Sequence, residues 1–124
     1  MILVFVDFMN SDEEIPIYKE YLKKLSIAAK VTDNPEDFMR PSAYTHVFLD
    51  YGGLDLPGNS LFSSLNSQVR NLVENNPSIE FVIISVMGEY GFEHILDFNA
   101  SNLHCMRNFR DKDELLKILT LSGE

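Results

Sequence analysis

Five short runs of apolar residues are spaced along the chain, and each has the length of a β-strand. The clearest are continuous stretches of branched and aromatic residues at positions 2–6, 47–49 and 81–84. Weaker runs of the same kind fall at positions 27–32 and 103–106. Because a strand that is covered on both faces has no polar side, unbroken apolar runs predict buried strands of a parallel sheet.

Between the predicted strands, apolar residues recur three or four positions apart, as they do on the buried face of a helix. The second helix is expected to begin at Asn34, an N-cap residue followed by Pro35 in the first turn. Acidic Asp111, Asp113 and Glu114 suit the positive amino-terminal end of the last helix. The apolar stripes are Ile17, Tyr21, Leu22 and Leu25, then Leu61, Leu65, Val69, Leu72 and Val73, then Phe92, Ile95 and Leu96, and finally Leu115, Leu116, Ile118 and Leu119.

The alternation of strand and helix predicts the fold class. Short connections with right-handed crossovers place the helices of such an α/β chain on both faces of one parallel sheet. No internal repeat and no Gly-, Ser- or Pro-rich linker divides the 124 residues. We therefore expect a single domain covering residues 1–124, built on one five-stranded parallel sheet with helices on both faces.

Composition narrows the choice of partners and compartment. Ten Lys and Arg residues face 19 Asp and Glu residues, and the net charge of −9 disfavours nucleic-acid and anionic-membrane partners. The first apolar run meets Asp7 almost at once, so it predicts neither a signal peptide nor a membrane span. With the single Cys105, this favours a reduced, cytoplasmic setting. We expect Cys105 to be an inert core thiol and His46, which precedes a buried strand, to be a structural residue with its hydrogen bonds satisfied.

Polar residues follow four of the predicted strands, where the carboxyl ends of the strands should meet. Asp7 follows the first strand, Asp50 the third, Ser85 the fourth and Arg107 the fifth. Because ligands of open parallel sheets bind beyond these ends, the four side chains are candidates for one site. Two carboxylates suit Mg²⁺, and a hydroxyl with a cation suits the oxygens of a phosphoryl group. The alternative is that they are simply the solvated ends of strands.

Four segments of the sequence resemble the receiver domains of response regulators. They are ILVFVDF, AKVTDNPEDFMRPSAYTHVFLDYGGLDLPG, FVIIS and HCMRNFRDKDELLKIL, and they extend over nearly the whole chain. The resemblance implies a receiver-like, flavodoxin-like fold in which Asp50 is the phosphoacceptor and Ser85 is the switch hydroxyl. It also implies that Arg107 holds the phosphoryl oxygens and that Mg²⁺ is bound by Asp7, Asp50 and the carbonyl of Gly52.

The sequence departs from receivers at several of these positions. Asp7 lies between two apolar residues where receivers carry two adjacent acids, so Mg²⁺ binding should be weak. Arg107 stands where receivers carry a lysine, and this replacement alters the contact with phosphate. Asn108 stands where they carry a proline, so the usual site of a cis peptide bond is lost. The resemblance further implies that His104 occupies the aromatic position on the fifth strand.

We therefore expect a stand-alone, atypical receiver that relays signals through contacts with protein partners, a kinase or a downstream effector. Phosphorylation at Asp50 is expected to be poor. A second interpretation is a receiver-like interaction module that is not phosphorylated. Whether the chain is an enzyme stays open, and these two interpretations favour a protein that is not one. Apolar residues in the last third of the chain predict a weak homodimer or a partner contact, and they are Phe92, Ile95, Leu96, Leu115 and Leu119.

A third interpretation is a metal-dependent nuclease. The segment DFMN at positions 7–10 resembles the D-x-x-N of NYN/PIN-type nucleases. Asp50, Glu89 and Asp97 could complete an acidic cluster for hydrolysis by two metal ions. The net charge of −9 argues against an RNA or DNA substrate, so this interpretation ranks below the receiver.

Overall fold

The computed structural model describes residues 1–6, 11–50, 69–84, 100–106 and 109–120. Its strands are β1 (Ile2–Val6), β2 (Ala29–Thr32), β3 (His46–Asp50), β4 (Glu80–Ile84) and β5 (Leu103–Met106). Its helices are α1 (Ser11–Lys24), α2 (Pro35–Met39), the short 3₁₀ helix η1 (Pro41–Ala43) and α5 (Lys112–Leu119). Residues 69–75 are helical as well.

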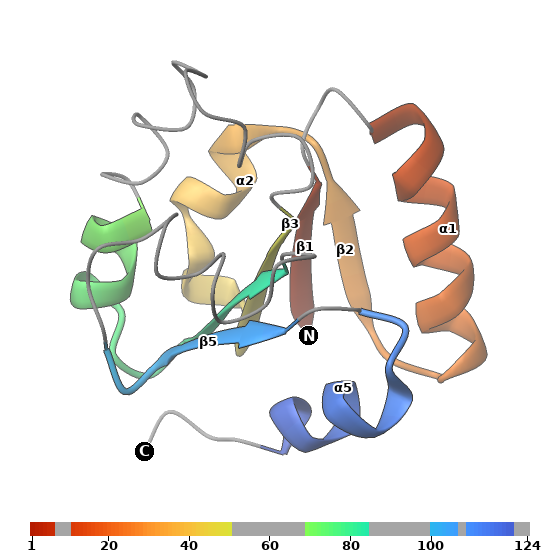
Figure 1. Ribbon diagram of the computed structural model, residues 1–124. Helices are drawn as coiled ribbons and strands as arrows, with labels where there is room; N and C mark the ends of the chain where they lie inside the picture. The colour runs from red at the N-terminus through yellow and green to blue at the C-terminus, as the bar shows by residue number, and fades with distance from the viewer. Residues whose placement is uncertain (7–10, 51–68, 85–99, 107–108, 121–124) are drawn as a thin grey trace, which may run out of the picture.

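The five strands belong to one sheet in which every neighbouring pair is parallel. Their order is β2-β1-β3-β4-β5. Helices α1 and α5 lie on one side of the sheet, and α2 lies on the other together with helical residues 69–75 (Figure 1). The predicted fold class, a single parallel sheet with helices on both faces, is thereby confirmed. This strand order is that of doubly wound flavodoxin-like proteins and is compatible with a receiver-like arrangement.

The core of the domain has two parts, because alternate residues of a strand point to opposite faces of the sheet. Beneath helical residues 69–75 lie Leu3, Phe5, Val47, Leu49, Phe81 and Ile83, together with Val69 and Val73 of that helix. Beneath α1 and α5 lie Val4, Phe48 and Val82, with Tyr18, Leu22, Phe109, Leu115 and Ile118. Both faces of the sheet are therefore covered and buried. This explains why its strands are continuous apolar runs and do not alternate between apolar and polar residues.

The buried face of α1 differs from the predicted one at a single position, since Tyr21, Leu22 and Leu25 do lie against the core. Tyr18 is 7% exposed and Leu22 is 2% exposed, whereas Ile17, expected on this face, is 38% exposed. Ile15 and Leu25 are partly buried against the same cluster as Tyr18 and Leu22. These four residues follow one another at steps of three or four positions, which is the spacing of one helix face. The prediction was wrong for Ile17 because that residue belongs to the neighbouring, solvent-facing stripe.

The predicted helix ends are confirmed at two places. The Asn34 side chain accepts a hydrogen bond from the backbone N–H of Glu36 at 3.0 Å, and a proline follows it in the first turn of α2. At the start of α5 the Asp111 side chain accepts from the backbone N–H of Glu114 at 3.2 Å. Each cap satisfies an N–H group that the helix itself leaves without a partner.

The apolar residues expected to form a partner contact fall into two groups. Leu115 is fully buried and Leu119 is partly buried, both against the core of their own domain. Leu115 therefore belongs to the core of the domain, and Leu119 packs partly against that core. Phe92, Ile95 and Leu96 lie outside the described residues, as do Leu61 and Leu65. Among the residues that the structure describes, no helix has the length and apolar character needed to cross a membrane.

Candidate functional site

The carboxyl ends of four strands lie in one row across the sheet. Asp50, the last residue of β3, is the register partner of Val6 in β1 and of Ile84 in β4. Ile84 in turn is the partner of Met106 in β5. In the sequence, Val6, Ile84 and Met106 are each followed directly by a predicted site residue. The strand register therefore agrees with the proposal that these strand ends share one edge.

Of the predicted site residues, Asp50 is the one whose surroundings can be described. Asp7, Gly52, Ser85 and Arg107 lie outside the described residues, and so do Asn10, Glu89 and Asp97 of the nuclease interpretation. Within the described part of the chain, no three His, Cys, Asp or Glu side chains gather in a way that could hold a metal ion.

Asp50 is half-buried and is contacted by a residue of α1. The hydroxyl of Tyr18 donates a hydrogen bond to Oδ2 of Asp50 at 2.5 Å. Burial, and then the neighbouring Asp50 carboxylate, raise the pKa of Tyr18 far above its ordinary 10.0. The phenol is therefore neutral at physiological pH and acts as a donor to the carboxylate.

The Tyr18 ring also belongs to an aromatic cluster around Phe109. Its centroid lies 4.7 Å from that of Phe109 in an edge-to-face arrangement. The ring centroid of Phe109 also lies 5.3 Å from that of Phe48 in β3 and 5.9 Å from that of Tyr21 in α1. The Tyr21 hydroxyl donates to the backbone carbonyl of Arg110 at 3.0 Å. Edge-to-face pairs of this kind are favourable beyond the area they bury, so Asp50 is linked by packed groups to the chain that leads into α5.

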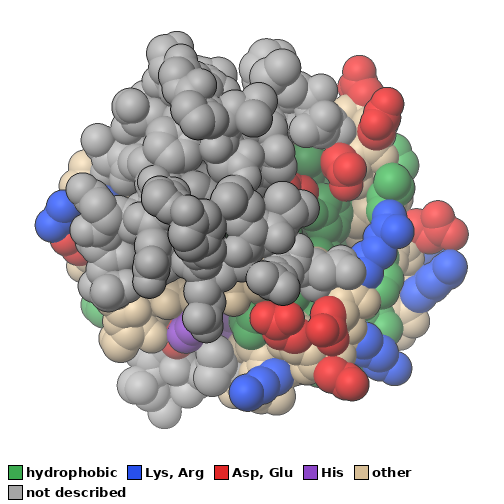
Figure 2. Space-filling view, in the orientation of Figure 1, with side chains coloured by type: hydrophobic (Ala, Val, Ile, Leu, Met, Phe, Trp, Pro, Cys, Tyr) green, Lys and Arg blue, Asp and Glu red, His purple; other side chains and the backbone are tan. Residues whose placement is uncertain are grey.

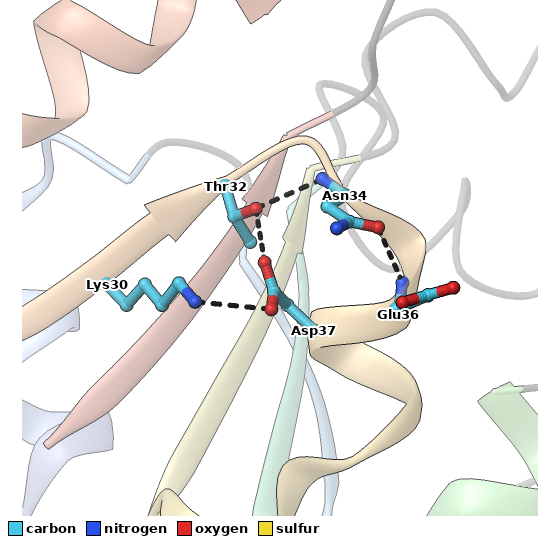
Figure 3. Close-up of polar contacts among 5 residues, drawn as sticks. All are labelled: Lys30, Thr32, Asn34, Glu36 and Asp37. Atoms are coloured by element: carbon cyan, nitrogen blue, oxygen red, sulfur yellow. Dashed lines mark hydrogen bonds and ion pairs between the residues drawn. The ribbon is translucent and has the colours of Figure 1, made fainter.

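A second polar group lies where β2 leads into α2 (Figure 3). The Thr32 hydroxyl donates to Oδ2 of Asp37 at 2.6 Å, and Lys30 Nζ lies 3.2 Å from Oδ1. The backbone N–H of Asn34 donates to the Thr32 hydroxyl at 3.0 Å. The Thr32 hydrogen bond and, after it, the Lys30 ammonium lower the pKa of Asp37 below its usual 3.8. Each of the five residues drawn takes part in at least one of these contacts, Glu36 through its backbone N–H, so this cluster holds the connection into α2.

The two described histidines lie on the sheet face covered by α1 and α5, toward the amino ends of the strands. His46 is buried and has Nδ1 2.9 Å from the Thr45 hydroxyl, so the prediction of a structural histidine with a hydrogen-bond partner is confirmed, although His46 begins β3 and does not precede it. His104 Nε2 lies at hydrogen-bond distance from Oε2 of Glu80, which begins β4 and is buried. The side chain expected at the aromatic position is thus bonded to the first residue of β4. Cys105 of β5 is half-buried, so its thiol is less enclosed than expected.

Tyr18 is the residue at this edge that sequence reasoning missed. A tyrosine within a helix is usually assigned to packing, and the predicted stripe ran through Tyr21 one turn away. The signal that could have found it is the spacing of Ile15, Tyr18 and Leu22, which places Tyr18 at the centre of the buried face. A polar end on an otherwise apolar buried side chain then predicts a hydrogen-bond partner on the sheet beneath.

Comparisons of the chain with protein-family models, with curated proteins and with solved structures found no match. Function is therefore inferred from the geometry of this edge of the sheet. That geometry consists of the strand register, the half-buried Asp50 and its hydrogen bond from Tyr18.

Proposed function

We propose that this chain is an atypical receiver-like signalling domain whose state is set by modification of Asp50. The single observation that carries the proposal is the position of that carboxylate. Asp50 ends the central strand β3, next to β1, and β2 follows β1 on the far side, so the strand order reverses between β1 and β3. In doubly wound sheets this reversal is where ligands bind, beyond the carboxyl ends of the strands.

The strand register supports the remaining members of the proposed site. The partners of Asp50, Val6 and Ile84, immediately precede Asp7 and Ser85 in the sequence, and Met106 precedes Arg107. In this proposal, Ser85 and Arg107 contact the oxygens of a phosphoryl group on Asp50. Such donors stabilise the charge that develops during phosphoryl transfer.

The chemistry of Asp50 fits a bound Mg²⁺. Magnesium is a hard cation that prefers carboxylate and carbonyl oxygens. A carboxylate offers about four lone-pair positions, and the Tyr18 hydroxyl occupies one of them. In this proposal Asp7, Asp50 and the Gly52 carbonyl hold the ion, which neutralises charge on the phosphodonor when bound. With one acid at the end of β1, we expect a dissociation constant of about a millimolar or weaker, equivalent to about −4 kcal/mol.

In this proposal, a small acyl phosphate can serve as the phosphodonor. A carboxylate oxygen of Asp50 attacks the phosphorus of acetyl phosphate and forms a new O–P bond. The bond between phosphorus and the acetate oxygen breaks, and acetate leaves with the electron pair. No oxidant or reductant is needed. In the cell a phosphorylated kinase histidine would supply the same group, and the modified domain would then act through a protein partner.

The surface in view agrees with a protein partner better than with a nucleic acid. Figure 2 shows acidic and basic side chains interspersed over α1 and α5, with no gathering of basic groups on the described part of this face. Glu20 and Lys24 of α1, both exposed, lie 3.6 Å apart as an example of this mixing. A nucleic-acid surface needs clustered Lys and Arg, so this side favours contacts between proteins.

The test is modification of Asp50 by acetyl phosphate in the presence of Mg²⁺, followed by intact mass and peptide mapping. We expect slow addition of one phosphoryl group, absent from Asp50→Asn. Asp33→Asn is the matched control, because Asp33 is an exposed acid directly after β2 at the same edge of the sheet, and it should be modified as the unaltered protein is. Beryllofluoride with Mg²⁺, followed by NMR, gives an independent measure of occupation. Modification that persists in Asp50→Asn, or none in the unaltered protein by either method, overturns the proposal.

A further inference from the structure

We infer that Tyr18 is a positioning residue for Asp50 and that it links the state of this carboxylate to Phe109 and the chain leading into α5. The inference rests on the proposed function and adds to it a route of regulation through α1. It is drawn from one hydrogen bond and three ring contacts, all among described residues.

The contact between Tyr18 and Asp50 is built from rigid elements. Tyr18 lies on the buried face of α1 and is 7% exposed, so its ring has little freedom to turn away. Asp50 ends a strand that is paired on both sides, with β1 and with β4. The residues are 32 positions apart in the chain, so the contact depends on the packing of α1 against the sheet.

The hydrogen bond restrains the chemistry of Asp50. A neutral phenol that donates to an ionised carboxylate makes a strong, charge-assisted bond and draws electron density from the oxygen that accepts it. Oδ2 is therefore a weaker nucleophile while Tyr18 holds it. When phosphorus bonds to the carboxylate, the charge on the accepting oxygen falls, and the bond from Tyr18 weakens or is lost. Tyr18 thus slows modification and responds to it.

The response has a direct path to α5. The Tyr18 ring meets Phe109 at 4.7 Å, and Phe109 also meets Phe48 and Tyr21. Phe109 is 3% exposed and lies just before the Asp111 cap of α5. A dense interior transmits small displacements, because no void is available to absorb them. A shift of the Tyr18 ring therefore reaches the start of α5 through Phe109 and through the Tyr21 contact with the Arg110 carbonyl.

The test compares Tyr18→Phe with Tyr21→Phe. Both variants delete one hydroxyl from α1 and keep a ring against Phe109, but only Tyr18 contacts Asp50. With acetyl phosphate and Mg²⁺, we expect Tyr18→Phe to be modified at Asp50 about tenfold faster than the unaltered protein, equivalent to about 1.4 kcal/mol in the barrier. Tyr21→Phe should keep the unaltered rate within twofold. A loss of structure would lower both rates, so an acceleration confined to Tyr18→Phe is not an effect of unfolding.

The second measurement follows amide NMR shifts at Phe109, Arg110 and Lys112 when beryllofluoride and Mg²⁺ are added. We expect these shifts in the unaltered protein and in Tyr21→Phe, and less than half of them in Tyr18→Phe. If Asp50 is modified at equal rates in all three proteins, or the shifts are equal, the inference fails and the proposed function stands. If none of the three is modified at Asp50, the proposed function fails and the inference falls with it.

Discussion

Asn102, just before β5, is a polar residue of the described part of the chain whose loss is expected to lower the stability of this fold strongly. Its side-chain Nδ2 donates to three backbone carbonyls: Val73 at 3.2 Å, Asn76 at 3.1 Å and Ile79 at 3.0 Å. Residue 77 is proline and has no N–H to give to Val73, four positions earlier, so Asn102 supplies the missing donor. One amide therefore joins the end of helix 69–75, the turn after it and the start of β4.

The size of the expected destabilisation follows from the hydrogen bonds that Asn102→Ala would remove. Asn102 is 6% exposed, so water does not readily replace its amide. Two N–H hydrogens shared among three acceptors are worth about 2 kcal/mol net, and leaving a buried carbonyl without its donor adds about 1–3 kcal/mol. We expect Asn102→Ala to lower the free energy of unfolding by about 3 kcal/mol, a large share of the ~5–15 kcal/mol typical of a domain. The midpoint of thermal unfolding should fall by about 10 °C.

The assay is urea unfolding followed by circular dichroism, with midpoint and slope fitted together. Asn71→Ala is the matched control, because Asn71 is an exposed asparagine on the same helical segment, and it should change stability by less than about 0.5 kcal/mol. Asn102→Asp should be worse than Asn102→Ala at neutral pH, since it sets a negative charge against three carbonyl oxygens. An Asn102→Ala protein as stable as Asn71→Ala would refute the reasoning.

Three further predictions concern acid stability, nucleic acid and assembly. The depressed pKa of Asp37 contributes stability that is present above its usual 3.8 and is lost as the pH falls through the lower, folded value. In urea titrations at pH 6, Asp37→Asn should therefore have a free energy of unfolding about 1–2 kcal/mol lower than that of the unaltered protein. The difference should be smaller below pH 3.8, and Asp33→Asn serves as the control. With Mn²⁺ or Mg²⁺, the protein should leave single-stranded RNA and DNA intact on gels; cleavage that disappears in Asp7→Asn would favour the nuclease interpretation. Sedimentation at rising protein concentration should show weak self-association. Leu116→Glu should reduce it, because Leu116 is an exposed apolar residue of α5. A strictly monomeric profile would contradict the expected homodimer.

The strands could be predicted because each is an apolar run, and the predicted bounds of β1 and β5 are confirmed, but the polar first residues of β3 and β4 could not be predicted. β3 and β4 begin one residue before the predicted runs, at His46 and Glu80. Hydropathy assigns such residues to loops. Glu80 is nevertheless buried, because His104 of the neighbouring strand contacts its carboxylate. A partner 24 positions away leaves no mark in a local pattern, so the polar ends of these strands emerge only when the sheet is assembled.

The candidate site could be predicted only in part: the position of Asp50 could be predicted, but its contact with Tyr18 could not. Asp50 could be placed at a strand end from its position after Val47 and Phe48, since parallel strands bring their carboxyl ends together. The hydrogen bond from Tyr18 could not, because it depends on the rotation of α1 about its own axis. The predicted stripe shares Tyr21, Leu22 and Leu25 with the observed buried face, but it takes Ile17 in place of Tyr18. Adjacent positions such as these lie about 100° apart around a helix. Periodicity identifies a helix far better than it fixes which of two adjacent stripes is buried.

The all-parallel pairing of the described sheet has a consequence for how the chain reaches its fold. Ile2 pairs with Ala29 and with His46, and His46 pairs with Glu80, so partners meet only after long stretches of chain are closed. Closing such loops lowers entropy before any contact compensates for it, which makes folding slow, on the order of milliseconds to seconds. During synthesis, the apolar β1 is made first and cannot pair with β3 until that strand has emerged from the ribosome. Until then the edge of β1 that pairs with β3 has no strand beside it, whereas β2, made earlier, can already pair with the other edge. We expect aggregation of nascent protein to increase when the arrival of β3 is slowed.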